Sequence, residues 1–176
     1  MKKLLVIIMA LIMVFTMASC GGNSESSEPQ GDASSQDLYA VVNGQEVRLG
    51  DSFDEIKGGL GEEAKPAEEI EPCDGDTDWL KTIHFYDGVS IHHNKDGIVE
   101  NIDINTYDVG EGDALFMGSV KLGDSVDNIK EIFGEPRQED EWSMDYMIGD
   151  VYLLVMKAEE ESDTIGEINF HPDGVM

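Results

Sequence analysis

The sequence has little positive charge. It contains 11 Lys and Arg residues against 38 Asp and Glu residues, which gives a formal net charge of −27 at pH 7. Such a chain repels nucleic acid and anionic lipid headgroups, so we exclude nucleic acid as a partner. The acidic balance favours a basic partner or weak association with divalent cations, although solvation of a secreted surface explains it more simply.

Cysteine is also scarce, because the chain has only Cys20 and Cys73. If Cys20 is acylated, Cys73 has no second cysteine with which to form an internal disulfide. We expect Cys73 to be a buried small hydrophobic residue rather than a reactive thiol, since no Cys–His cluster surrounds it in the sequence.

The common catalytic signatures are missing. The chain has no Gly-x-Ser-x-Gly elbow, no His-Glu-x-x-His zinc motif and no phosphate-binding loop. Asp and Glu are so abundant that spacing alone identifies no catalytic carboxylate pair. The sequence therefore predicts a protein that is not an enzyme, with no catalytic residue, no metal ligand and no cofactor.

Two patterns match metal sites only in part. The segment from Asp74 to Asp78 has oxygen ligands at alternate positions, but it lacks the Gly and the final Glu of an EF-hand loop. His92 and His93 are neighbours on a predicted strand and must face opposite sides. Pairing across the Asp87-Gly88 turn places His84 and His93 on one face, and two histidines without a third ligand make a weak transition-metal site.

The only long apolar run lies at the N-terminus. Lys2 and Lys3 precede it, and the segment from Leu4 to Ala18 is almost entirely apolar. About 15 residues are too few for a comfortable membrane span, so this order is typical of a secretory signal. Ser19-Cys20 follows and resembles the bacterial lipobox, in which the cysteine is joined to a diacylglycerol.

We therefore predict that residues 1–19 are a signal peptide and that Cys20 anchors the protein to the extracytoplasmic face of the cell membrane. A plain signal peptide cleaved nearby, or an uncleaved anchor helix, is the alternative. Residues 20–37 form the lipidated end and a tether. Gly21 to Asp37 contains no large apolar residue, so it cannot bury enough surface to become ordered. Its expected reach is on the order of 20–25 Å.

The most informative positive feature is a motif that occurs twice. Residues 47–62 and 120–135 are identical at ten of sixteen aligned positions, and both copies end in Gly-Glu. This duplication predicts two tandem repeats, 38–106 and 117–176, joined by a linker at 107–116. The expected fold class is α+β, in which each repeat is a short helix followed by an antiparallel β-meander and the helices pack on one face of the sheet.

Turn and capping signals define the expected elements. Asn43-Gly44 predicts a hairpin, and Ser52 with Glu55 predicts a capping box at the start of the first helix. Gly61 and Gly134 are expected to end the helices, of which the first is the weaker because it carries Gly58 and Gly59. The expected strands that follow the helices are 81–86, 89–93, 98–106, 143–148, 151–158 and 164–171.

This tandem arrangement resembles the β-lactamase inhibitor protein and the single-copy lipoproteins of the outer-membrane barrel-assembly machinery. Pro72-Cys73-x-Gly75, the Tyr86-Asp87-Gly88 hairpin and the Ile102-x-Ile104 strand are similar to a group of uncharacterised Gram-positive surface lipoproteins. The resemblance implies the fold of residues 38–176. It implies no inhibitory residue, because no segment of this chain matches the inhibitory loop residue by residue, and the chain also lacks the disulfides of the inhibitor proteins.

The predicted function is that of a non-enzymatic binding module on the cell surface, with a protein or glycan of the envelope as its partner. The binding face is expected on the sheet, on the side away from the helices. Inhibition of a secreted hydrolase is one alternative, and a metal-binding or enzymatic envelope protein is another. Trp79, Trp142, Tyr146 and Tyr152 are the aromatic candidates for interface anchors, although core packing is the expected role of most of them.

Overall fold

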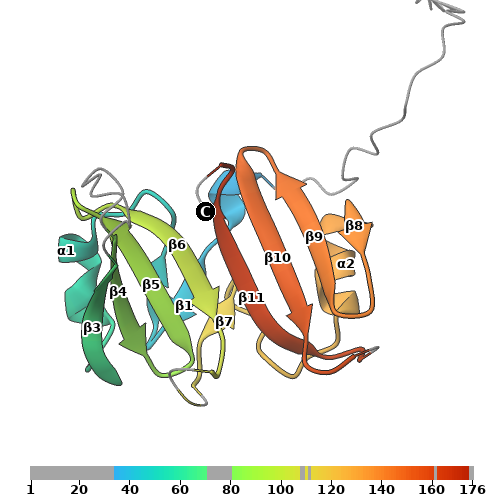
Figure 1. Ribbon diagram of the computed structural model, residues 1–176, viewed down its shortest axis with the longest axis horizontal. Helices are drawn as coiled ribbons and strands as arrows, with labels where there is room; N and C mark the ends of the chain where they lie inside the picture. Colours follow the sequence, from blue (N-terminus) through green and yellow to red (C-terminus); the bar gives the residue numbers. More distant parts are fainter. Residues whose placement is uncertain (1–33, 71–80, 108–109, 111, 161, 175–176) are drawn as a thin grey trace, which may run out of the picture.

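The computed structural model describes residues 34–70, 81–107, 110, 112–160 and 162–174. These residues form a mixed α+β fold that is mostly antiparallel β-sheet, with two short α-helices (Figure 1). Cys20, Cys73, Trp79 and the acidic segment 74–78 lie outside the described residues.

An eight-stranded antiparallel sheet forms the front layer in Figure 1, with strand order β3-β4-β5-β6-β11-β10-β9-β8. We call β3 to β6 with helix α1 the first half of the molecule, and β8 to β11 with helix α2 the second half. The strands of the first half are β3 (Lys65–Ile70), β4 (Lys81–Tyr86), β5 (Val89–Asn94) and β6 (Val99–Ile104). Those of the second half are β8 (Gln138–Glu139), β9 (Ser143–Ile148), β10 (Val151–Lys157) and β11 (Ile165–Pro172).

The sheet is continuous across the junction of the halves, because β6 pairs with β11. The two central hairpins have the same register about their two-residue turns. Tyr86 pairs with Val89 across Asp87-Gly88, and Ile148 pairs with Val151 across Gly149-Asp150. The structure therefore confirms the predicted strands 81–86, 89–93, 143–148 and 151–158, which are β4, β5, β9 and β10. The polar strands β3 and β8 were not predicted, because neither shows alternating apolar residues.

A smaller sheet, of order β2-β1-β7, lies behind the large one together with both helices (Figure 1). Its strands are β1 (Ala40–Val42), β2 (Gln45–Val47) and β7 (Leu115–Phe116). A 3-10 turn, η1 (Ser35–Asp37), precedes them, so the last residues of the predicted tether are ordered, and Arg48 Nη1 donates to the Gln36 carbonyl oxygen at 2.7 Å. Asn43 and Gly44 have φ of 52° and 83°, which is the left-handed backbone that the predicted two-residue hairpin turn requires. Strand β7 lies at the end of the predicted linker, where it pairs with β1.

The helices are α1 (Phe53–Ile56), extended by the 3-10 turn η2 (Lys57–Gly59), and α2 (Asp127–Phe133). Gly134 ends α2 with φ of 78°, as predicted. The predicted capping box is wrong, because the Ser52 side chain makes no cap hydrogen bond. Ser52 instead forms a β-bridge with Ile98, which fixes its backbone from the sheet side.

An aspartate closes the turn before each helix in the same way. Asp51 Oδ2 accepts a hydrogen bond from the Arg48 amide at 2.7 Å, and Asp124 Oδ2 accepts one from the Lys121 amide at 3.0 Å. The repeated Gly-Asp-Ser segment therefore builds the same turn twice. It does so through a side chain–backbone bond that competes with helical capping.

One continuous apolar cluster lies between the layers. It draws side chains from both helices, from both sheets and from both halves, including the fully buried Ile91, Phe116, Ile129, Leu153 and Phe170. Each helix is too short to be stable alone. The helices therefore depend on packing against the sheet, and one apolar core serves both halves of the molecule.

Candidate functional site

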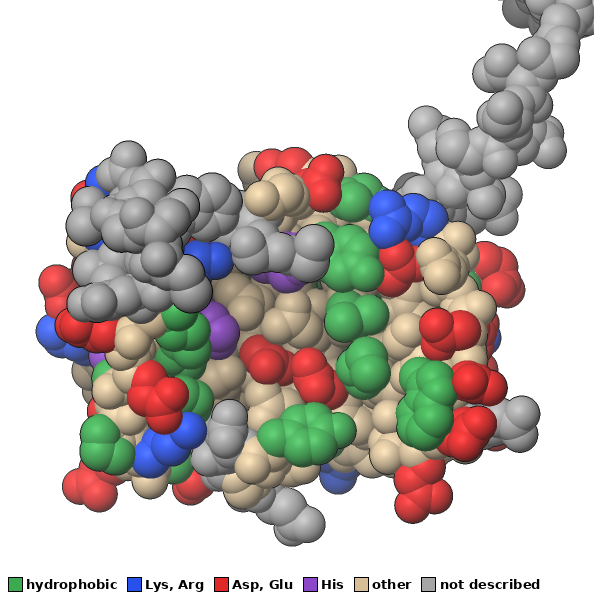
Figure 2. All heavy atoms as spheres, in the orientation of Figure 1, with side chains coloured by type: hydrophobic (Ala, Val, Ile, Leu, Met, Phe, Trp, Pro, Cys, Tyr) green, Lys and Arg blue, Asp and Glu red, His purple; other side chains and the backbone are tan. Residues whose placement is uncertain are grey.

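The face of the large sheet away from the helices is its open face. Among the described residues, no helix or strand covers it (Figures 1 and 2). Strand alternation sends every second side chain to this face. The residues on it include Ser90, His92, Asn101, Asp103, Asn169, Tyr152, Leu154 and Met156.

A polar network crosses the centre of the open face. Asn169 Nδ2 donates to Asn101 Oδ1 at 3.0 Å, which ties β11 to β6 across the junction. Asn101 Nδ2 lies 3.5 Å from His92 Nδ1, and His92 Nε2 lies 3.5 Å from Ser90 Oγ. Burial, and then the charge of Lys81, lower the pKa of His92 to about 4. The imidazole is therefore neutral at physiological pH and acts as a fixed polar group.

Two carboxyl groups meet at the same junction. Asp103 lies on β6, and Glu167 lies diagonally across from it on β11. Burial, followed by the charge of Asp103 and a side-chain hydrogen bond to it, raises the pKa of Glu167 to about 7. The pair therefore shares a proton below neutrality, because two adjacent carboxylates in a half-buried place repel each other.

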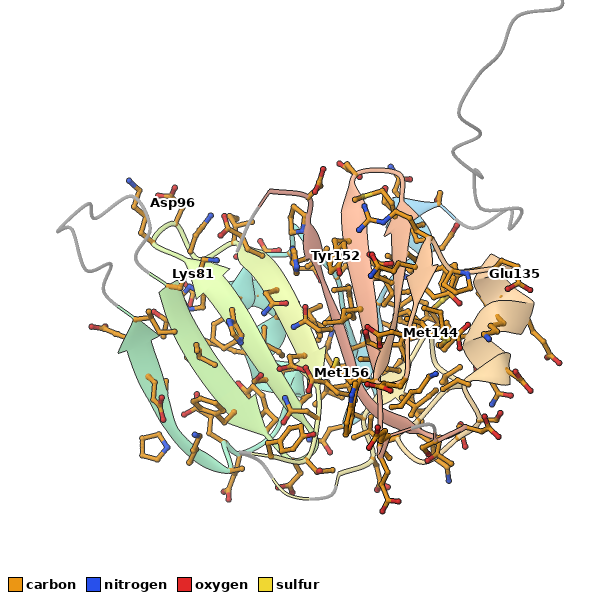
Figure 3. The ribbon with its side chains drawn as sticks, turned by 45° about the vertical axis from the view of Figure 1, so that its right-hand side comes forward. Lys81, Asp96, Glu135, Met144, Tyr152 and Met156 are labelled. Carbon is orange, nitrogen blue, oxygen red and sulfur yellow. The ribbon has the colours of Figure 1, made fainter. Side chains whose placement is uncertain are left out.

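An apolar column runs along β10 beside this polar centre. Tyr152, Leu154 and Met156 alternate with buried residues and are half-buried on the open face. Figure 3 shows that Tyr152 and Met156 both come from this strand, and Figure 2 shows apolar side chains gathered on this face among acidic ones. Apolar side chains that stay half-exposed in the middle of a sheet are available to a partner.

Tyr152 is held in place from both sides. Its ring lies 5.3 Å from that of His171, and the Arg137 guanidinium lies 5.5 Å from its centroid. Arg137 also forms an ion pair with Asp145, whose side chain is largely buried, and its Nε lies 3.1 Å from Oδ2. The column therefore begins at an aromatic ring whose orientation is fixed before any partner binds.

A second candidate lies on the opposite side of the sheet, in a pocket of about 580 Å³ beside α1. It is lined in part by Phe53, Glu63, His84 and His93. His84 Nε2 and His93 Nε2 face each other at 3.2 Å. The predicted register is thereby confirmed, because His84 pairs with Ile91 and shares a face with His93. The predicted separation of His92 from this pair is confirmed as well.

Outer contacts fix both rings of this pair. His84 Nδ1 lies 2.6 Å from Glu63 Oε1, and His93 Nδ1 lies 2.7 Å from the Asn94 carbonyl oxygen. Phe53 stacks on His84 with ring centroids 3.9 Å apart. Sequence reasoning identified the two histidines, but it missed Glu63, which lies in the segment before β3 and gives no periodic signal.

The aromatic candidates have separate roles. Tyr146 is buried in the core at 1% exposure, which confirms the packing role for that residue. Trp142 is 47% exposed just before β9, and Tyr152 is half-buried on the open face. The Asp103–Glu167 pair was not predicted, because it depends on the pairing of β6 with β11, whose residues lie far apart in the sequence.

Within the described ranges, no cluster of three or more His, Cys, Asp or Glu residues could hold a metal ion as it stands. In the same part of the chain, no helix has the length and apolar character needed to cross a bilayer. No protein-family model, no curated protein and no solved structure matches this chain.

Proposed function

We propose that the protein is a membrane-anchored extracytoplasmic lipoprotein that acts as a non-enzymatic binding module. Its binding surface is the open face of the eight-stranded sheet, and its partner is a protein of the cell envelope that presents a basic loop. Cys20 attaches the chain to the membrane, and the tether that follows it holds the folded part away from the bilayer.

The observation that carries this proposal is the apolar column Tyr152–Leu154–Met156 beside a fixed polar network. Interfaces need an apolar centre with satisfied polar groups around it, and this face has both. Arg137 and His171 position Tyr152, so little side-chain entropy is lost when a partner binds.

The negative charge of the open face indicates that the partner is basic. Asp103 and Glu167 lie at the centre of the face, in a chain of net charge −27. A Lys or Arg from the partner would relieve the repulsion within the pair and lower the pKa of Glu167. Affinity for such a partner should therefore rise as pH increases through about 7, and association should slow as salt is added.

We further propose that the two halves are tandem repeats of one helix-and-meander unit. The matching hairpin registers and the two aspartate-closed turns support this interpretation. Duplication would explain why the face is broad, since β6 and β11 join two four-stranded meanders edge to edge.

The test is capture from cell-envelope extract with the full chain, compared with two charge-matched variants. Leu154→Arg changes the column, whereas Asn128→Arg introduces the same side chain and the same change of charge on the exposed face of α2. We expect Leu154→Arg to lose the captured protein, Asn128→Arg to retain it, and salt to weaken the association. Equal capture by both variants would show that the binding surface is not the open face.

The identity of the captured protein separates the alternatives. Recovery of a secreted hydrolase that the chain inhibits would favour the inhibitor function implied by the resemblance. A screen of the purified chain against esterase, glycosidase, peptidase and phosphatase substrates tests the non-enzymatic assignment. Turnover that disappears in Glu167→Gln or His92→Gln would overturn it.

The anchor has its own test. Cys20→Ala should release the protein to the medium or leave an unprocessed precursor. A fully cleaved Cys20→Ala protein that stays on the membrane would contradict lipid anchoring.

A further inference from the structure

The hydrogen bonds around His84 and His93 determine where their protons lie. The Asn94 carbonyl can only accept, so His93 Nδ1, at 2.7 Å from it, carries the hydrogen. The Glu63 carboxylate likewise accepts from His84 Nδ1 at 2.6 Å. In the neutral rings both Nε2 atoms are then bare lone pairs, and they face each other at 3.2 Å. Two lone pairs at this distance repel unless a cation lies between the rings.

The distance between the two nitrogens fits a metal ion. Zinc–imidazole bonds of about 2.0–2.1 Å at the tetrahedral angle place two ligand nitrogens roughly 3.3 Å apart. The observed Nε2–Nε2 separation is 3.2 Å. The Glu63–His84 contact also matches the carboxylate–histidine arrangement that orients a metal ligand and increases its basicity.

The rings are held rigidly and still border open space. Phe53 stacks on His84 at 3.9 Å and lies 4.9 Å from the His93 ring, so neither imidazole can turn freely. Both histidines line the pocket of about 580 Å³ beside α1, which also contains Asp54 and Glu63. Water or an exogenous ligand can therefore complete the coordination that two protein ligands begin.

The fold does not require histidine at these positions. Counting outward from the matching hairpin turns, the second half has Tyr146 at the place of His84 and Val155 at the place of His93. Both are buried apolar contacts, at 1% and 0% exposure, and Tyr146 packs on Phe133. The first half thus has two polar, convergent side chains where core packing would suffice.

From this geometry we infer that His84 and His93 bind a divalent transition-metal ion of the zinc class through their Nε2 atoms. Glu63 is a positioning residue that holds the His84 tautomer. The site has two protein ligands and open coordination positions, which is why no three-residue metal cluster is present among the described residues. It lies on the helix-covered side of the sheet, so it does not depend on the open-face proposal.

The experiment is isothermal titration of the metal-free full chain with ZnCl₂ near neutral pH, using a purification tag without histidine. We expect a single zinc ion per chain in the wild type. His84→Gln and His93→Gln should each weaken binding by about tenfold or more, and Glu63→Gln by about tenfold. His92→Gln is the matched control, because it removes a neighbouring histidine from the other face and should leave binding unchanged.

Histidine NMR on the same samples keeps the test independent of folding defects in the variants. Zinc should shift the ring signals of His84 and His93 and leave those of His92 and His171 in place. Zinc binding that persists in both glutamine variants would place the ion elsewhere on the acidic surface and overturn the proposal. The absence of zinc binding in the wild type, with a proton shared between the two rings, would overturn it equally.

Discussion

The two halves of the sheet differ mainly in the helix that covers them. Helix α2 has seven residues and buries Ile129 and Phe133 almost completely. Helix α1 has four residues and continues as a 3-10 turn through Gly58 and Gly59. The longer helix packs Ile129 and Phe133 into the apolar core, and the pocket with the histidine pair lies beside the shorter helix. Similar turns and registers can therefore support either packing or a candidate site, depending on how much of the sheet the helix covers.

The largest expected difference between the halves is the cost of truncating a core isoleucine. Ile129 is fully buried, and Ile56 is 9% exposed. We expect Ile129→Ala to reduce the free energy of unfolding by about 4 kcal/mol and Ile56→Ala by about 2 kcal/mol, because the less buried Ile56 side chain loses fewer apolar contacts when it is truncated. Urea unfolding measures both values.

The shape of those unfolding curves tests the shared core. One transition in both variants is expected, since a single apolar cluster contains residues of both halves. Two separate transitions, or a larger loss for Ile56→Ala, would contradict the comparison.

The second difference concerns cations on the open face. Arg137 pairs with Asp145, whose side chain is 11% exposed, whereas Lys65 lies 3.7 Å from the centroid of the Phe85 ring. Arg137→Gln should cost about 1–2 kcal/mol, because Asp145 is left buried without its cation although the exposed guanidinium is screened. Lys65→Gln should cost about 0.5 kcal/mol. Thermal unfolding compares the two variants, and equal losses would show that the burial of Asp145 does not matter.

The third prediction addresses the weaker helix directly. A Cβ on Gly58 would meet no atom within 4 Å, and the residue does not adopt a positive φ. Gly58→Ala should therefore stabilise the protein by about 0.5–1 kcal/mol, because alanine restricts the unfolded chain and favours helix. Gly61→Ala is the control. Gly61 has a φ of 89°, which alanine rarely adopts, so this substitution should destabilise the protein. If chemical unfolding shows no gain in stability for Gly58→Ala, the low helix propensity of Gly58 does not limit the stability of η2.

Local signals predicted most of the strands. The turns at Asn43-Gly44 and Asp87-Gly88 have fixed lengths, so alternation then sets which side chains share a face. This is why the shared face of His84 and His93 followed from sequence. Strand β3 was missed because almost all of its side chains are exposed, which removes the alternating pattern.

Contacts between segments distant in the sequence could not be predicted in the same way. The Asn169–Asn101 bond joins residues 68 positions apart, and it exists only because β11 pairs with β6. Glu63 contacts His84 from a segment with no periodic pattern. The repeat motif indicated two similar units, but it contained no information about which of their edges would meet.

The last difference depends on pH and lies at the junction itself, where Asp103 of the first half meets Glu167 of the second. The pKa of Glu167 is raised from 4.5 to about 7, so the folded state binds more protons than the unfolded state between these pH values. Stability linked to this group is therefore lost as pH rises through that window. Glu167→Gln removes the titration, and its urea midpoint should exceed that of the wild type above about pH 7 and match it below about pH 4.5. Asp103→Asn should remove only part of the effect, because burial, the largest cause of the shift, remains. Identical pH profiles for Glu167→Gln and the wild type would show that the two halves meet without a strained carboxyl pair.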